Sequence, residues 1–146
     1  MYKGLDIAAG AVILLMTVLG IIAGRKNHGT LDKRYFQRRW NRVQKLCADK
    51  KLWYKAIIDA DELLDEALIK ANFKGKTTGE RLVSAQHYFT ANDAVWFSHK
   101  LKNKITEQGL KKLSKKQTME AMSAIRLALF DLGAIKSIKK EKSGGK

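Results

Sequence analysis

The residues best placed for chemistry in this sequence are His99, Lys102 and Asn103. His99 and Asn103 are one helical turn apart, so a helix places both side chains on one face. An imidazole near its ordinary pKa can move a proton at neutral pH, and a nearby cation can stabilise charge on a phosphate group. This turn is therefore a candidate for acid–base chemistry. Partly buried packing is the alternative interpretation of the histidine.

An arginine and a histidine, Arg81 and His87, lie close together earlier in the chain. Such a pair arises easily by chance. Packing within a helical bundle is again the alternative interpretation of the histidine. We keep Arg81 and His87 as candidate residues beside the turn at His99.

Metal ligands are not clustered in this sequence. His28, His87 and His99 are far apart, and no group of cysteines accompanies them. Acidic residues are dense between Asp59 and Glu66, but the Glu-x-x-His pairs of helical di-metal sites are missing. We therefore predict no metal and no cofactor. We expect these acidic residues to pair with the arginines of the preceding helix or to face solvent.

The longest apolar run extends from Ile7 to Gly24 and contains no charged residue. A hydrocarbon core about 30 Å thick requires about 20 apolar residues of helix, and a helix satisfies its own backbone polar groups there. We predict that residues 1–26 form a single transmembrane anchor. Lys and Arg dominate the segment that follows, which predicts an outside N-terminus and a cytoplasmic C-terminal domain. A cleaved signal peptide and a buried core helix are the alternatives.

Positive charge is concentrated directly after this run. The chain of 146 residues has a formal net charge of +15, and one cysteine, Cys47, excludes an internal disulfide and is expected to fill core space. Anionic lipid headgroups attract a basic residue near the membrane by about 1 kcal/mol, and nucleic acid is a second possible partner. Solvated faces of a basic protein are the third reading. The candidate contact residues are Arg25, Lys26, Lys33, Arg34, Arg38, Arg39 and Arg42.

The remaining sequence predicts an all-α fold, a four- to five-helix bundle over residues 27–135. Proline is absent, and apolar residues recur at intervals of three and four. Such stripes must be buried against one another, as in a bundle. Residues 136–146 predict a basic disordered tail. The expected helices cover residues 31–48, 50–72, 78–89, about 92–108 and 115–132, and the first two could also form one long rod.

Capping residues set the expected helix ends. Thr30 and Asp49 are expected to cap the first two helices, and Thr77 and Ser114 each begin a capping-box pattern. Thr90 or Asn92 would start the fourth helix. Glycines at 109 and 133 are expected to stop the last two helices, because glycine adopts the left-handed conformation that follows a helix.

Three stretches carry a resemblance to known proteins. They are Trp53-x-x-Ala56-Ile57-Ile58-x-Ala60-Asp61, Gly75-Lys76-Thr77-x-Gly79-Glu80-Arg81-Leu82 and Val95-Trp96-x-x-His99-Lys100-Leu101-Lys102-Asn103. Over residues 53–133 the chain resembles small proteins of ultra-small episymbiotic bacteria of the candidate phyla radiation, Saccharibacteria among them. That family is largely uncharacterised, so the resemblance implies membrane-anchored helical proteins and little about function.

The same region is more loosely similar to the HEPN fold, a helical bundle that often dimerises and includes many ribonucleases. The resemblance implies an Arg-Asn-x-x-x-His motif in the active site. Here Lys102-Asn103 occupies the arginine position and Glu107 the histidine position. Lysine lacks the bidentate fork of arginine, and glutamate does not replace a near-neutral proton shuttle. The nuclease motif is therefore degraded.

Three functions are compatible with these patterns. The first is a membrane-tethered cytoplasmic helical-bundle interaction module without catalytic activity, which binds a protein partner or itself as a homodimer. The second is a membrane-anchored ribonuclease of HEPN type, in which His99, Lys102 and Asn103, with Arg81 or His87, contact RNA. The third is a protein that binds nucleic acid or anionic lipid through its basic juxtamembrane helix. We expect the first.

Overall fold

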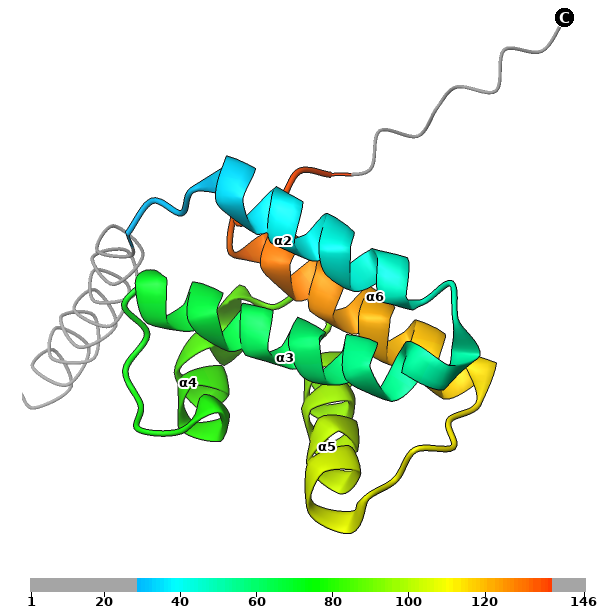
Figure 1. Ribbon diagram of the computed structural model, residues 1–146. Helices are drawn as coiled ribbons and strands as arrows, with labels where there is room; N and C mark the ends of the chain where they lie inside the picture. The colour runs from blue at the N-terminus through cyan, green and yellow to red at the C-terminus, as the bar shows by residue number, and fades with distance from the viewer. Residues whose placement is uncertain (1–28, 138–146) are drawn as a thin grey trace, which may run out of the picture.

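The structure, a computed structural model, describes residues 29–137, and this part of the chain is entirely helical. The predicted anchor and residues 138–146 lie outside the described residues. No helix within 29–137 is long and apolar enough to cross a membrane. The five α-helices of Figure 1 are α2 Lys33–Leu46, α3 Trp53–Lys70, α4 Thr78–Ala85, α5 Asn92–Gln108 and α6 Lys115–Asp131.

Helix α2 begins at Lys33, about one turn before Phe36, the first buried residue of the helix. An aspartate caps this helix. The carboxylate of Asp32 accepts hydrogen bonds from the backbone N–H groups of Arg34 and Tyr35, at 3.0 and 3.1 Å. The prediction that Thr30 is the cap was therefore wrong. Aspartate caps a helix as well as threonine does, and Asp32 adjoins the first helical residue, Lys33.

Helices α2 and α3 are separate and not one rod. Asp49 caps a single 3₁₀ turn, Lys50–Leu52, by accepting from the N–H of Lys51 at 2.9 Å. The indole N–H of Trp53 donates to the carbonyl of Cys47 at 2.9 Å, across this corner. The corner folds α3 back alongside α2, as Figure 1 shows.

The segment between α3 and α4 holds the start of α4 against the end of α3. Asn72 has a left-handed backbone, with φ of 62°. At Gly75, where φ is 156°, a Cβ atom would lie 2.7 Å from the backbone nitrogen of Arg81, so only glycine fits this approach. Thr77 caps α4 as predicted, but the Glu80 carboxylate accepts from the N–H of Lys76 and not from that of Thr77. Helix α4 also ends at Ala85, earlier than expected.

The last two helices begin and end close to their predicted positions. The capping box at Ser114 and Gln117 is present, with backbone-to-side-chain distances of 3.1 and 3.0 Å in its two hydrogen bonds. Gly109 and Gly133 have φ of 65° and 75° after α5 and α6. Thr90 does not cap α5. Its N–H and hydroxyl instead donate to Asp131, at 2.7 and 2.9 Å, which ties the start of α5 to the end of α6.

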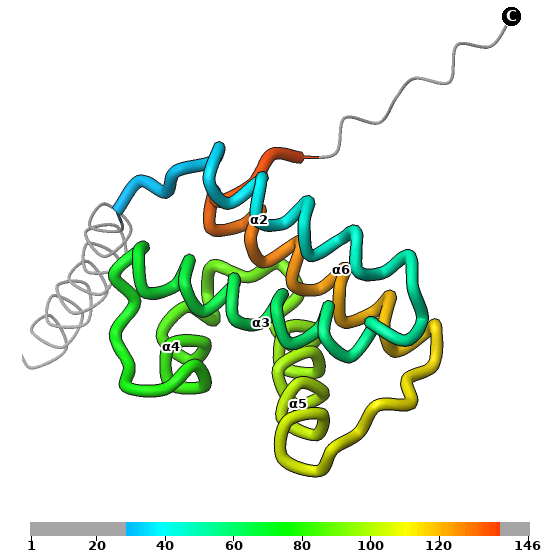
Figure 2. Tube along the Cα trace, in the orientation of Figure 1, coloured from blue at the N-terminus to red at the C-terminus, as the bar shows by residue number. Residues whose placement is uncertain are grey.

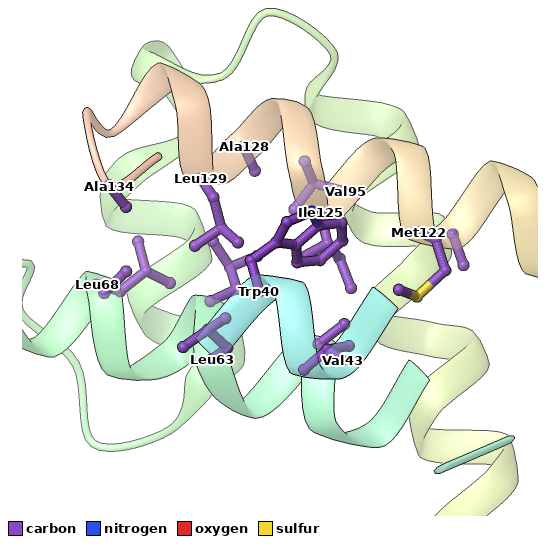
Figure 3. Packing of buried hydrophobic residues seen from close by; sticks show 14 of the residues in the cluster. Trp40, Val43, Leu63, Leu68, Val95, Met122, Ile125, Ala128, Leu129 and Ala134 are labelled. Carbon is purple, nitrogen blue, oxygen red and sulfur yellow. The ribbon is translucent and has the colours of Figure 1, made fainter. Parts of the chain in front are cut away.

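Helix α3 is the centre of the bundle, because it packs against all four other helices. In Figure 3, Trp40 reaches from α2 toward Ile125 of α6, above Leu63 of α3. The chain after α6 returns to α2 (Figure 2), where the N–H of Lys136 donates to the side chain of Gln37 at 3.2 Å. The core consists mainly of the fully buried side chains Phe36, Ile57, Leu63, Leu64, Leu68, Leu82, Val95, Ile125, Leu129 and Ile135.

Candidate functional site

The predicted turn on α5 meets a carboxylate of α3. Nδ1 of His99 lies 3.0 and 3.2 Å from the two carboxylate oxygens of Asp61. Nζ of Lys102 is 3.7 Å from the same carboxylate. On the other side of the ring, the amide nitrogen of Asn103 is 3.5 Å from Nε2 of His99. We call these four residues the Asp61–His99 cluster.

The Asp61–His99 cluster is buried and neutralises its own charge. Asp61 is 1% exposed and His99 is 8% exposed. A buried carboxylate is costly unless it is paired, and here a ring N–H and an ammonium group face it. Because Nδ1 faces the carboxylate, that nitrogen carries the ring proton, and Nε2 is left with its lone pair toward Asn103. The tautomer is thus assigned from the partners of the ring.

Sequence reasoning found three members of this cluster and missed Asp61. It grouped Asp61 with acids that pair with α2 or face solvent, and for this residue that prediction was wrong. A signal was available, because Asp61 lies at helical spacing from Ile57, Leu64 and Leu68, all fully buried. A charged residue in register with an apolar stripe indicates a buried partner on a neighbouring helix.

Access to the free nitrogen of His99 is narrow. A Cβ atom built on Gly79, in the first turn of α4, would lie 4.0 Å from Nε2 and 3.9 Å from the Trp96 ring. The Trp96 and His99 rings meet edge to face, with centroids 6.0 Å apart. Only 10% of the His99 side chain is exposed. The arrangement packs the imidazole beside Trp96 and the first turn of α4.

The second predicted pair is not assembled. Arg81 makes a bidentate ion pair with Asp65 of α3, at 2.7 and 2.8 Å, and also donates to the carbonyl of Gly75 at 2.7 Å. Hydrogen bonding to Asp65 raises the pKa of Arg81. His87 lies in an exposed 3₁₀ turn, Gln86–Tyr88, after α4. Arg81 therefore joins α4 to α3, and the prediction that it acts with His87 has no geometric support.

The basic residues of α2 divide into two groups. Arg34, Arg38 and Arg42 follow one another at intervals of four on the exposed side of α2, near exposed Lys33. Arg39 is instead half-buried, and its Nη1 donates to the Tyr35 hydroxyl at 2.6 Å and lies 3.5 Å from Glu66. Arg25 and Lys26 lie outside the described residues. The outward group forms a cationic surface, whereas Arg39 is a structural residue.

Glu66 of α3 is the common partner of Tyr35, Arg39 and Lys70. It accepts from the Tyr35 hydroxyl at 2.6 Å and pairs with Lys70 at 3.1 Å. Burial pushes the pKa of Glu66 upward, but the hydrogen bonds from Tyr35 and Lys70 and the charges of Lys70 and Arg39 outweigh it and lower the pKa. The predicted pairing of α3 acids with α2 arginines is therefore correct for Glu66.

Two apolar hollows flank α6, and sequence reasoning predicted neither. The first hollow, of about 270 Å³, lies between α2, the start of α3 and α6. The second hollow, of about 520 Å³, lies between α5 and α6 and is lined in part by Phe97 and Leu127. Ser123 borders both, so α6 forms a ridge between them. The first hollow is lined by Trp40, Gln44, Cys47, Trp53, Lys115, Thr118, Met119, Met122, Ser123 and Arg126.

Large apolar side chains stand on this ridge. Met119 and Phe130 of α6 are 58% and 43% exposed, and Phe97 of the adjoining α5 is 37% exposed. Together with Ser123 and Leu127 they form what we call the α6 face. These exposed apolar side chains make the α6 face a candidate contact surface.

The chain's single cysteine belongs to the wall of the first hollow. Cys47 is half-buried and packs against the core. Burial raises the pKa of the Cys47 thiol, so the group stays protonated at neutral pH and contributes apolar surface. Within residues 29–137 no three His, Cys, Asp or Glu side chains are grouped in a way that could hold a metal ion.

Comparisons with known proteins add no identity to this geometry. Neither a protein-family model, nor a curated protein, nor a solved structure matches the chain. Its function must therefore be argued from the Asp61–His99 cluster, the cationic surface of α2 and the α6 face.

Proposed function

We propose that this chain is a non-catalytic interaction module that docks a protein partner, or a second copy of itself, on the α6 face. The observation that carries the proposal is the exposure of Met119, Phe130 and Phe97 beside two apolar hollows. Methionine and aromatic side chains are common in protein interfaces, and the second hollow, beside Phe97, can receive a side chain of a partner.

The Asp61–His99 cluster supports the same proposal, because its contacts join α3 to α5 and account for the burial of its residues. Its carboxylate, ring and ammonium group satisfy one another between α3 and α5. A catalytic base needs a free nitrogen within reach of a substrate proton, and Nε2 of His99 faces Asn103 beneath the first turn of α4. We therefore assign the cluster to the packing of α5 against α3.

The cationic surface of α2 is consistent with a module held near a membrane. Arg34, Arg38 and Arg42 are exposed, and α2 directly follows the segment that the sequence predicts to be an anchor. Anionic headgroups would attract each such residue by about 1 kcal/mol. We propose that the domain lies on the cytoplasmic side, with α2 toward the headgroups.

Position-specific photocrosslinking tests the docking proposal. The photoreactive residue p-benzoylphenylalanine replaces Met119 or Phe130 in the full-length chain, expressed in its own cellular membrane. Val83 of α4 is the matched control, because it is an equally apolar side chain and 52% exposed, but lies outside the α6 face. We expect a discrete adduct from both α6 positions and none from Val83. Equal adducts at all three positions, or none at α6, would refute the proposal.

A ribonuclease remains the second candidate, favoured by one observation. The 3.0 Å contact between Asp61 and Nδ1 of His99 is the arrangement that orients a catalytic imidazole. Cleavage of a labelled RNA by the full-length chain separates the candidates. We expect no cleavage above background. Cleavage that His99→Gln abolishes and His87→Gln preserves would establish the ribonuclease and displace the interaction module.

A further inference from the structure

We propose that the first hollow binds an anionic amphiphile, an alkyl chain of about ten carbons with a carboxylate or phosphate head. The head would lie at Arg126 and Trp40, and the alkyl chain would occupy the space between Trp53 and Met122. This inference goes beyond the docking of a macromolecule on α6. It can also be tested separately, because ligand binding in the hollow does not require a docked partner.

The size of the first hollow suits a short alkyl chain. Its volume of about 270 Å³ is close to that of about nine water molecules at about 30 Å³ each. A methylene group is similar in size to a water molecule. The hollow is at the lower limit for small-molecule sites and too small for a complete two-chain lipid.

Two polar groups in the walls of the first hollow are already hydrogen-bonded to the protein backbone. The indole N–H of Trp53 donates to the carbonyl of Cys47, and the hydroxyl of Thr118 donates to the carbonyl of Ser114 at 3.0 Å. The thiol of Cys47 is protonated. Met119 and Met122 have flexible thioether chains that can adjust to a ligand.

One wall group lacks a partner. The indole N–H of Trp40 is fully buried and meets no acceptor among the residues that the structure describes. Nearly all buried donors in proteins are hydrogen-bonded, so an orphaned donor in a cavity wall is informative. An oxygen atom brought into the hollow by a ligand, after a small movement of the ring, would satisfy it.

Charge decides which kind of amphiphile fits. Arg126 and Lys115 border the first hollow, and neither takes part in the ion pairs found across residues 29–137. The second hollow is bordered instead by Asp93 and Glu120. An anionic head is therefore attracted to the first hollow and repelled from the second. A cationic or neutral head gains nothing at the first.

The binding test uses the full-length chain in phosphatidylcholine nanodiscs and two built-in probes. Two of the three tryptophans, Trp40 and Trp53, line the hollow, so a brominated decanoate would quench their fluorescence. The single cysteine, Cys47, lies in the same wall, so a ligand would slow its reaction with a maleimide. The added ligands are hexanoate, octanoate, decanoate, dodecyl phosphate and decylamine.

We expect saturable protection of Cys47 by decanoate. The dissociation constant should fall about fourfold for each added methylene from hexanoate to decanoate, since each buried methylene contributes a constant increment. Decylamine should bind at least about tenfold more weakly than decanoate. Arg126→Gln should weaken decanoate binding about fivefold to tenfold, the effect of losing a half-buried charged partner.

The matched control is Lys116→Gln, which removes the same charge from the same helix but does not border the hollow. We expect it to change decanoate binding less than twofold. Equal effects of the two variants, equal binding of decylamine, or protection that never saturates would overturn the proposal. Helical circular dichroism of both variants confirms that each is folded.

Two further arms identify the source of the amphiphile and the competing class of ligand. Nanodiscs that contain phosphatidylglycerol distinguish the two sources. A membrane lipid would insert one of its chains and slow the Cys47 reaction without added fatty acid, whereas a free carboxylate or phosphate must be added. Either result supports the proposal. An acetylated Glu-Leu-Glu peptide that protects Cys47 where decanoate does not would assign the hollow to a partner's side chain and overturn it.

Discussion

Asp61 shows how a single buried carboxylate can determine the packing of two helices. Its carboxylate is hydrogen-bonded to His99 and paired with the ammonium group of Lys102, both from α5. A salt bridge of this kind adds little over an apolar pair, but removing one partner leaves an uncompensated charge in the core. The cluster therefore makes the contact between α3 and α5 specific. Loss of one of its members should lower the free energy of unfolding.

Replacement of His99 by alanine tests this role. We expect His99→Ala to lower the free energy of unfolding by about 3 kcal/mol, because Asp61 loses its closest partner inside the core. His87→Ala, at an exposed position, should change it by less than about 0.5 kcal/mol. Urea unfolding followed by tryptophan fluorescence measures both. Similar small effects of the two substitutions would contradict a structural role for the cluster.

Glu66 should make stability depend on pH. Its pKa in the folded chain is lowered, so its contribution is present above the ordinary glutamate value of about 4.3 and is lost as pH falls through the lower folded value. Glu66→Gln should thus cost less than about 1 kcal/mol near pH 7, since the carboxylate is partly exposed.

The difference in the free energy of unfolding between Glu66→Gln and the wild-type chain should become smaller as the pH falls below the ordinary pKa of glutamate. Glu107→Gln, at an exposed position, is the control and should show no such narrowing. Unfolding curves measured between about pH 3 and pH 7 give the comparison. A Glu66→Gln penalty that grows on acidification would mean that the sign of the pKa shift is wrong.

For the helices, the sequence predicted several of the caps at helix ends but not the contacts between helices. The capping box at Ser114 and the glycine after α6 were readable because both act within one turn of the chain. The partner of Asp61 lies far away in the sequence, on α5, and no local rule identifies it. Thr30 was mistaken for a cap because the helix begins two residues later than expected, where the carboxylate of Asp32 caps it.

A pair of capping substitutions checks this assignment. Ser114→Ala should lower the free energy of unfolding by about 1 kcal/mol, because the N–H of Gln117 loses its acceptor. Thr30→Ala should have almost no effect, since Asp32 already caps α2. Thermal unfolding by circular dichroism compares the two. A larger loss from Thr30→Ala would show that α2 starts earlier than it does here.

In the molecule as a whole, the residues that stabilise the fold are buried, whereas those available for contact lie on the exposed side of α6. Within residues 29–137, apolar periodicity predicted the all-α class and a bundle of four to five helices, of which the structure has five. The hollows beside α6 could not be predicted, because they arise where Trp40 and Trp53 meet α6 from different segments. Met122 belongs to the apolar stripe of α6 and is buried, whereas Met119 is 58% exposed.

A substitution in the core should therefore lower stability, and a substitution on the α6 face should prevent docking. Ile125→Ala should lower the free energy of unfolding by about 3 kcal/mol, since the side chain is fully buried between α6 and its neighbours. Ser123→Arg, on the exposed ridge of α6, should leave stability within about 0.5 kcal/mol but block docking. Urea unfolding measures the first effect, and crosslinking from Phe130 measures the second.

The most direct measurement of the central claim is the yield of the Phe130 photocrosslink in the full-length chain, with and without Ser123→Arg. The account predicts a discrete adduct that Ser123→Arg reduces at least about tenfold, while the chain remains folded. An adduct that persists unchanged in the Ser123→Arg chain would contradict docking on the α6 face.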